Sequence, residues 1–146
     1  MSPKKVIISA CLLGENCRYD GKTKKDQNIL DAYEGWKILP FCPEAPLFGT
    51  PRERINVIRE DGCDKIITDK NNLDVTKLLE EEILSFINKY PDIDEIVLKS
   101  KSPSCGSGTT PILDKGKNII DYGDGIAAAM MKKEYFTIQI KDETKV

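Results

Sequence analysis

The side chains best suited to chemistry in this chain are its five cysteines, Cys11, Cys17, Cys42, Cys63 and Cys105. The 146 residues include no histidine. That excludes Ser-His-Asp and Cys-His relays, the HExxH zinc site and acid–base catalysis by imidazole. Any metal must therefore bind thiolates or carboxylates, and any general base must be Asp, Glu, Lys, Tyr or a bound water.

Three of the cysteines follow segments that are predicted to be β-strands. The segments are apolar and rich in β-branched residues, as central strands of a parallel sheet are. They end directly before Cys11 and Cys42 and a few residues before Cys105. Because the carboxyl ends of parallel strands meet at one edge of a sheet, where ligands bind, we expect these thiols to converge. The three segments are 4–10 (KKVIISA), 36–41 (WKILPF) and 95–99 (EIVLK).

Converging thiolates without histidine favour a soft metal centre, such as an iron–sulfur cluster or zinc. The spacing alone is not diagnostic, since the chain has no C-x2-C pair and none of the known ferredoxin spacings. The alternative is that these cysteines pack as small apolar side chains. Cys17 lies in the loop after the first strand and is within reach of the same edge, whereas Cys63 falls in a predicted hairpin turn and has no expected role.

Polar side chains beside these cysteines are candidates for handling a substrate. Glu44 lies two residues after Cys42, and the proline between them stiffens the link. Its carboxylate is thus a candidate general base, the alternatives being a solvated loop residue or a helix-cap partner. Ser102 and Ser104 belong to a Ser/Gly-rich loop that is able to present hydroxyl and N–H groups to a ligand, or that is a plain turn.

The arginines divide into one candidate ligand and several expected surface charges. Arg18 is a candidate for an anionic group of the substrate, because guanidinium suits phosphate. For Arg52 we expect an exposed ion pair of little energetic weight. Arg54, Arg59 and the run 22–25 are expected to be solvated.

The remaining pattern indicates an α/β fold. Apolar residues recurring at spacings of three and four predict a helix over 75–90, and Asp26 is a candidate cap for a short helix ending near 33. Strands that alternate with helices predict a single Rossmann-like layered domain over 1–146, with a mostly parallel sheet flanked by helices. The other predicted elements are hairpins over 55–68 and 112–120, a helix over 125–132 and a strand over 135–140.

Composition bounds the class of protein. The net charge of −2 gives no general attraction to nucleic acid or anionic membranes. The apolar segment 6–13 is too short to span a bilayer and is not followed by a cleavage site for export, so we expect no membrane anchor and a cytoplasmic protein with reduced thiols. The odd number of cysteines also argues against a disulfide framework.

Four motifs resemble, in the same order, those of the thiouracil desulfidase family, long catalogued only as a domain of unknown function. The resemblance covers essentially the whole chain. The first and third motifs are specific, the second is moderately so, and the last is weak alone. The motifs are SACLLGENCRYDG (Ser9–Gly21), FCPE (Phe41–Glu44), KSKSPSCG (Lys99–Gly106) and GDG (Gly123–Gly125).

The resemblance implies a [4Fe–4S] cluster held by only three cysteines, with one iron open. Cys17 also matches a family cysteine, and it would either replace one of the three cysteine ligands named below or serve near the substrate. Glu44 matches the catalytic glutamate of the family, and Ser102 its catalytic serine. The implied ligands are Cys11, Cys42 and Cys105. The substrate-binding candidates in the same motifs are Ser9, Arg18, Lys101 and Ser104.

The implied reaction is the non-redox removal of sulfur from a thiolated uracil base or nucleotide (thiouracil, 4-thiouracil or 4-thio-UMP), with release of hydrosulfide. An open iron has affinity for sulfur, Glu44 would activate water, and Ser102 would position the base. Segments 50–55 and 113–116 depart from the family pattern and are candidate walls of the pocket, so base, nucleotide and thiolated RNA all stay open. The low net charge favours a small molecule over tRNA.

Two other interpretations stay open. The segment 11–18 is similar to the anion loop of low-molecular-weight tyrosine phosphatases, although six residues instead of five separate Cys11 from Arg18, and the chain has no Asp-Pro acid. The third interpretation is a non-catalytic iron–sulfur sensor or binding protein, in which Cys17 would be a fourth ligand. The sequence does not indicate an oligomeric state.

Overall fold

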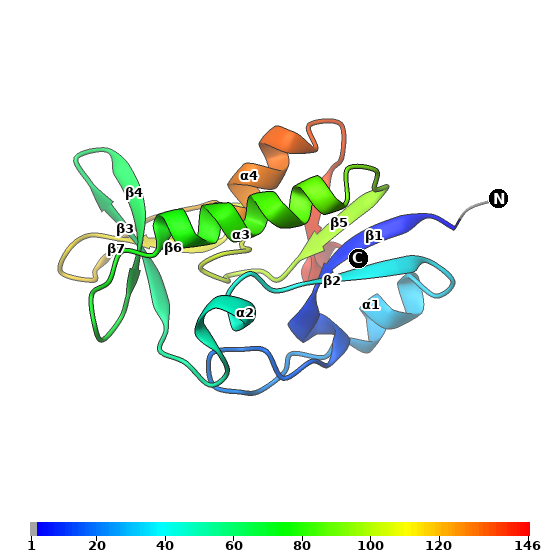
Figure 1. Cartoon of the computed structure of the whole chain (residues 1–146), viewed down its shortest axis with the longest axis horizontal. Helices are drawn as coiled ribbons and strands as arrows, with labels where there is room; N and C mark the ends of the chain where they lie inside the picture. The colour runs from blue at the N-terminus through cyan, green and yellow to red at the C-terminus, as the bar shows by residue number, and fades with distance from the viewer. Residues whose placement is uncertain (1–2) are drawn as a thin grey trace.

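The strands form two four-stranded sheets in a computed structural model that describes residues 3–146 (Figure 1). The first sheet contains, in spatial order, β2 (Lys37–Phe41), β1 (Lys5–Ser9), β5 (Glu95–Leu98) and β8 (Ile140–Asp142). The second contains β4 (Cys63–Thr68), β3 (Ile55–Glu60), β6 (Thr110–Leu113) and β7 (Ile119–Gly123). The helices are α1 (Gln27–Ala32), α2 (Ala45–Phe48), α3 (Thr76–Lys89) and α4 (Ile126–Glu134), with 3-10 turns η1 (Ala10–Leu13) and η2 (Glu143–Lys145).

The first sheet is parallel throughout, and β1 lies between β2 and β5. Successive side chains of a strand point to opposite faces, and both faces of this sheet are covered. Ile7 and Ile96 pack in the core that α3 and α4 share, whereas Val6 and Ile8 pack with Ile29 of α1. Burial on both faces explains why these strands read as continuous apolar runs.

The second sheet is mixed and corrects the expectation of one mostly parallel sheet. Its β3 and β4 form an antiparallel hairpin, while β3 and β6 run parallel. Asp61 and Gly62 make the two-residue hairpin turn, and both have positive φ, as a type I′ turn requires. The helix α3 extends from the second sheet to the first, so one core serves both (Figure 1).

Two local predictions differ from the structure. The strand expected over 135–140 begins only at Ile140, because Tyr135 is buried at the end of α4 and its hydroxyl donates to the carbonyl of Tyr90 at 2.7 Å. That anchor overrides the alternating pattern of the segment. Cys63, expected in a turn, is the first residue of β4 and is exposed.

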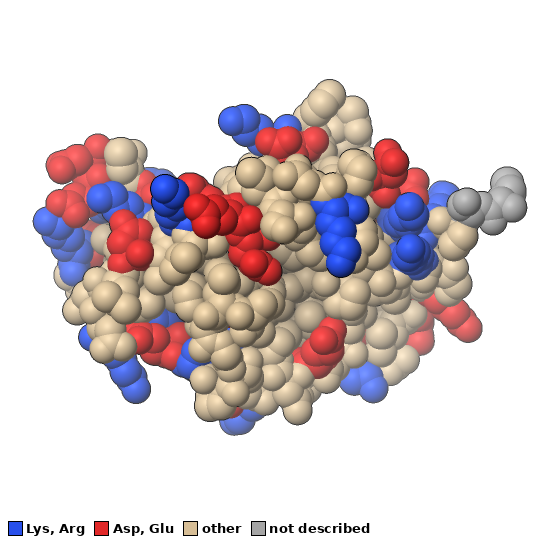
Figure 2. Space-filling view, in the orientation of Figure 1, with Lys and Arg blue, Asp and Glu red and all other residues tan. Residues whose placement is uncertain are grey.

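The described surface carries charges of both signs. Figure 2 shows acidic and basic side chains intermixed on one face, most densely at the end formed by the second sheet. Across residues 3–146, none of the helices combines the length and the apolar character needed to cross a bilayer.

Candidate functional site at the carboxyl edge of the first sheet

A cavity of about 650 Å³ opens where β1, β2 and β5 end. It is lined by every candidate that the sequence motifs provided, although 93 residues lie between the first cysteine and the last. The parallel strand ends thus bring together segments that are far apart in the chain. The candidates on its wall are Ser9, Cys11, Cys17, Arg18, Cys42, Glu44, Lys101, Ser102, Ser104 and Cys105.

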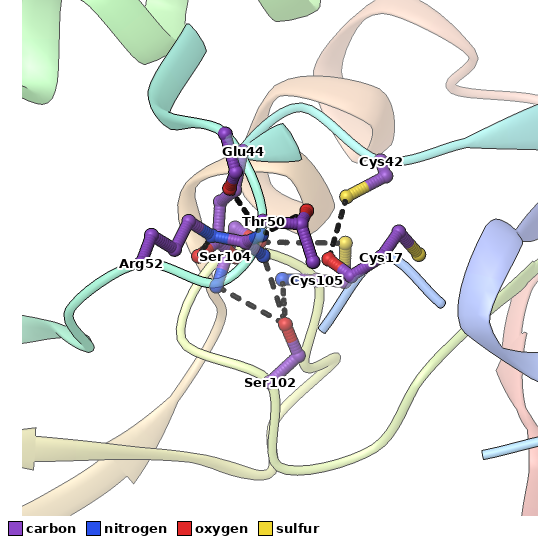
Figure 3. A network of polar contacts seen from close by, with 9 residues as sticks. Cys17, Cys42, Glu44, Thr50, Arg52, Ser102, Ser104 and Cys105 are labelled. Carbon is purple, nitrogen blue, oxygen red and sulfur yellow. Dashed lines mark hydrogen bonds and ion pairs between the residues drawn. The ribbon is translucent and has the colours of Figure 1, made fainter. Parts of the chain in front are cut away.

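Four of these side chains are thiols, held by the loops that leave the strands. Cys11 and Cys105 are buried, and Cys17 and Cys42 are half-buried. Cys11 lies in η1, and its carbonyl accepts hydrogen bonds from the loop that contains Thr23. The thiol of Cys42 donates to the carbonyl of Cys17 at 3.8 Å (Figure 3).

Hydrogen bonds among the thiols make them unequal. The contact with Cys17 lowers the pKa of Cys11, although burial opposes that shift, and the same contact raises the pKa of Cys17 to about 11. A hydrogen bond with Cys17, together with burial, raises the pKa of Cys42. Burial raises the pKa of Cys105 to about 12. Since metals bind the thiolate form, loading this set with metal must release protons.

The donor set fits a soft metal group. Within residues 3–146, no three His, Cys, Asp or Glu side chains are arranged to hold a single metal ion. A [4Fe–4S] cluster makes a different demand, because each thiolate binds its own iron and the sulfur atoms need not meet at one point. Four thiols on one cavity wall, with no histidine in the chain, are the ligand type that such clusters use.

Glu44 is a buried carboxylate on the same cavity wall as the thiols. It follows Cys42 and a proline and is 8 % exposed, which rules out the alternative of a solvated loop residue. Its Oε2 accepts a hydrogen bond from the hydroxyl of Ser104 at 2.7 Å, and its Oε1 lies 3.5 Å from Nε of Arg52 (Figure 3). The expected exposed ion pair of Arg52 is wrong, because its side chain is only 5 % exposed. The loop before β3 folds inward, where the N–H of Arg52 donates to the carbonyl of Tyr19.

The two serines take different places. The hydroxyl oxygen of Ser102 accepts the N–H groups of Ser104 and Cys105 at 3.3 and 3.1 Å and thereby closes the loop. Ser104, expected to bind substrate, is the serine that touches Glu44. Gly125 explains the GDG motif, because a Cβ there would lie 2.6 Å from the carbonyl oxygen of Ser104. Only glycine lets α4 approach this loop so closely.

The other substrate-binding candidates lie around the rim and floor. Ser9 is buried, and its hydroxyl accepts the N–H of Lys99 at 2.9 Å, which ties β1 to β5. Arg18 lies 5.8 Å from the ring of Tyr19. Lys101 is exposed, with a positive φ of 62°.

Sequence reasoning missed several wall residues. Tyr19 lines the cavity, with the guanidinium of Arg54 4.5 Å from its ring. Lys99 and Glu143 form an ion pair of 3.0 Å on the same wall. One signal was available, since segments 50–55 and 113–116 were expected near the pocket; Arg52, Arg54, Ile55 and Leu113 do line it.

Comparisons with known proteins agree with the motifs. Residues 6–143 match the model of the 2-thiouracil desulfurase family. A protein of Bacillus subtilis (strain 168) called uncharacterized protein YbbK is 33 % identical over 150 residues, covering 94 % of this chain and 96 % of that protein. The solved structure of the [4Fe-4S]-dependent thiouracil desulfidase TudS superposes with a TM-score of 0.73 at 32 % identity, covering 98 % of this chain and 93 % of that one. The chain therefore belongs to the 2-thiouracil desulfurase family.

Proposed function

We propose that this protein is a non-redox desulfidase that removes sulfur from a thiolated uracil base or nucleotide and releases hydrosulfide. The observation that carries the proposal is the cavity whose wall contains four thiols and a buried glutamate, in a chain of the 2-thiouracil desulfurase family. The phosphatase alternative needs one nucleophilic thiol and gives no reason for the other three.

The cofactor is a [4Fe–4S] cluster with one open iron. Its ligands are Cys11, Cys42 and Cys105, which the motif match and the shared cavity support. When bound, the cluster supplies a Lewis-acidic iron with affinity for sulfur. Cys17 remains as a fourth thiol near the substrate.

The chain's own polar groups handle water and the base. Glu44 takes a proton from water at Oε1, because Oε2 is engaged by the hydroxyl of Ser104. The oxygen of Ser102 accepts two backbone N–H groups, and its own O–H, which has the hydroxyl of Ser104 3.4 Å away, would turn to donate to the bound base. The net change is a thiocarbonyl plus water giving a carbonyl plus hydrosulfide and a proton.

The charge on the cavity wall bears on the substrate. The charged side chains of the wall are two carboxylates, Glu44 and Glu143, and six cations. The cations suit an anionic group such as the phosphate of 4-thio-UMP. Arg52 and Lys99 are paired with the two carboxylates, so the cations left for such a group are Arg18, Lys24, Arg54 and Lys101.

An anoxic assay tests the proposal. The protein is purified without oxygen, reconstituted with iron and sulfide, and assayed for sulfide release from 2-thiouracil, 4-thiouracil and 4-thio-UMP. We expect visible absorbance of a cluster and release from at least one substrate. A loaded protein that releases sulfide from none of them contradicts the proposal. A cluster that binds no thiolated base, and that loses a ligand in Cys17→Ser, would instead identify the sensor alternative.

A further inference from the structure

Arg52 is a buried cation whose position is set by its own loop. Its Nη1 donates to the carbonyl of Gly49 at 3.0 Å and to the hydroxyl of Thr50 at 3.2 Å. Its backbone N–H donates to the carbonyl of Tyr19 at 2.7 Å. These contacts hold the guanidinium at the cavity wall, where it also forms an ion pair of 3.5 Å with Glu44 (Figure 3).

One donor of this guanidinium has no acceptor. Nε of Arg52 is buried and makes no hydrogen bond to any group in the described part of the chain. The nearest anion, Oε1 of Glu44, lies 3.5 Å away and does not meet hydrogen-bond geometry. A buried N–H without an acceptor costs free energy, so its presence on a cavity wall points to an acceptor that enters with the reaction.

The two oxygens of Glu44 differ in the hydrogen bonds that they already accept. Oε2 already accepts the hydroxyl of Ser104 at 2.7 Å. Oε1 lies 3.5 Å from the orphan N–H nitrogen of Arg52 and accepts no hydrogen bond from residues 3–146. A water beside both atoms would donate to Oε1 and accept from Nε, and both groups would then be satisfied.

We propose that Arg52 is a catalytic residue whose Nε–H, together with Oε1 of Glu44, holds the hydrolytic water. This inference rests on the proposed desulfidase function. The O–H bond of the water breaks, its proton goes to Oε1, and its oxygen bonds to the thiocarbonyl carbon. The C–S bond then breaks with its electron pair on sulfur, which takes the remaining hydroxyl proton and leaves as hydrosulfide, while Glu44 returns its proton to solvent.

The chemistry of guanidinium suits this task. Arginine keeps its protons in proteins, so it orients the water without competing for the proton that Glu44 must receive. Its fork also lets Nη1 fix the loop while Nε faces the water. Lysine has a single ammonium nitrogen on a flexible stem and is a poor substitute for both contacts.

Kinetics of Arg52→Gln, Arg52→Lys and Arg52→Ala on the reconstituted protein test the inference. Loss of one preorganised donor typically lowers kcat by about 10²–10³-fold, and we expect that for Arg52→Gln, with KM and cluster absorbance unchanged. Guanidinium added to Arg52→Ala should restore part of kcat, and should not do so for Glu44→Gln. Arg59→Gln, which removes an arginine of the second sheet, is the matched control and should behave as wild type.

Each outcome decides. A kcat of Arg52→Gln within twofold of wild type overturns the inference, and so does an effect confined to KM, which would mark a substrate contact. Should Arg52→Gln and Arg52→Ala both melt below the assay temperature, Arg52→Lys decides, and wild-type kcat there overturns the inference. If the wild-type protein with its cluster releases no sulfide, the proposed function fails instead, which is a separate result.

Discussion

The cavity and the second sheet each contain an arginine that pairs with carboxylate, and the two ion pairs differ in their distances and in their burial. On the second sheet, Arg59 meets Asp64 at 2.7 Å and Asp121 at 2.9 Å, with all three side chains at least a third exposed. In the cavity, Arg52 and Glu44 are nearly buried, yet their atoms stay 3.5 Å apart and one N–H lacks an acceptor. The shorter contacts thus occur in the exposed ion pair, where solvent makes them contribute least to stability.

This difference separates structural from functional pairing. An exposed pair can relax to its best geometry because water satisfies whatever it leaves open. A buried pair that leaves a donor open retains it at a cost, which is typical of sites that bind something else. The same contrast holds for the cysteines, four of which line the cavity while one is exposed on β4.

The largest expected effect comes from the cysteines. Cys105→Ala should abolish cluster binding and all sulfide release, because a buried ligand would be lost. Cys63→Ala should load iron and turn over as wild type. Cluster binding is measured as iron and sulfide per chain after reconstitution, together with the visible absorbance. Equal iron content in the two variants would show that Cys105 is not a ligand.

The next largest effect tests the proposed general base, Glu44. Glu44→Gln keeps the size of the side chain and an acceptor for Ser104, but removes the basic oxygen. We expect kcat to fall by about 10²–10⁴-fold, with the cluster retained. Steady-state sulfide release and the absorbance spectrum give the two readings. Turnover close to that of wild type would mean that another group takes the proton.

A smaller effect is expected from substituting Glu143, which has a full set of hydrogen-bond partners and therefore contributes to stability. Burial opposes ionisation of its carboxyl, but the N–H and hydroxyl of Ser100 and the ammonium of Lys99 outweigh it and hold the pKa of Glu143 below its usual 4.5. The stabilisation is therefore complete above that value and is lost as the pH falls through the folded-state pKa. Glu143→Gln should cost about 1–2 kcal/mol at neutral pH.

Melting curves of the wild type and Glu143→Gln against pH check this sign. The difference in Tm should be constant near neutrality and should shrink on acidification below the usual carboxyl range. A difference that grows as the pH falls would contradict the assignment.

The smallest effect belongs to Arg59. Arg59→Gln should leave Tm unchanged within error, because exposed ion pairs are screened by water and salt. Thermal melts of the wild type and Arg59→Gln at low and high ionic strength check this expectation. A clear, salt-sensitive loss of Tm would show that the exposed pair contributes more than this comparison assigns to it.

The sequence predicted which residues meet at the carboxyl edge of the first sheet, but not how the strands divide into two sheets. Strand ends placed Cys11 and Cys42 correctly because parallel strands share an edge, and local patterns gave α3 and both hairpins. The division into two sheets was not predictable, since the pairing of β3 with β6 joins residues 55 positions apart. Arg52 looked like a surface residue because no local pattern reveals that its loop folds inward onto Tyr19.

The stoichiometry of turnover tests the central claim most directly. The loaded protein is incubated without oxygen with 2-thiouracil, 4-thiouracil or 4-thio-UMP, with no electron donor or acceptor present, and the oxygenated product and sulfide are both counted. Non-redox hydrolysis predicts equal amounts of the two over many turnovers. Turnover that requires an electron donor, or sulfide that appears without the matching uracil product, would contradict it.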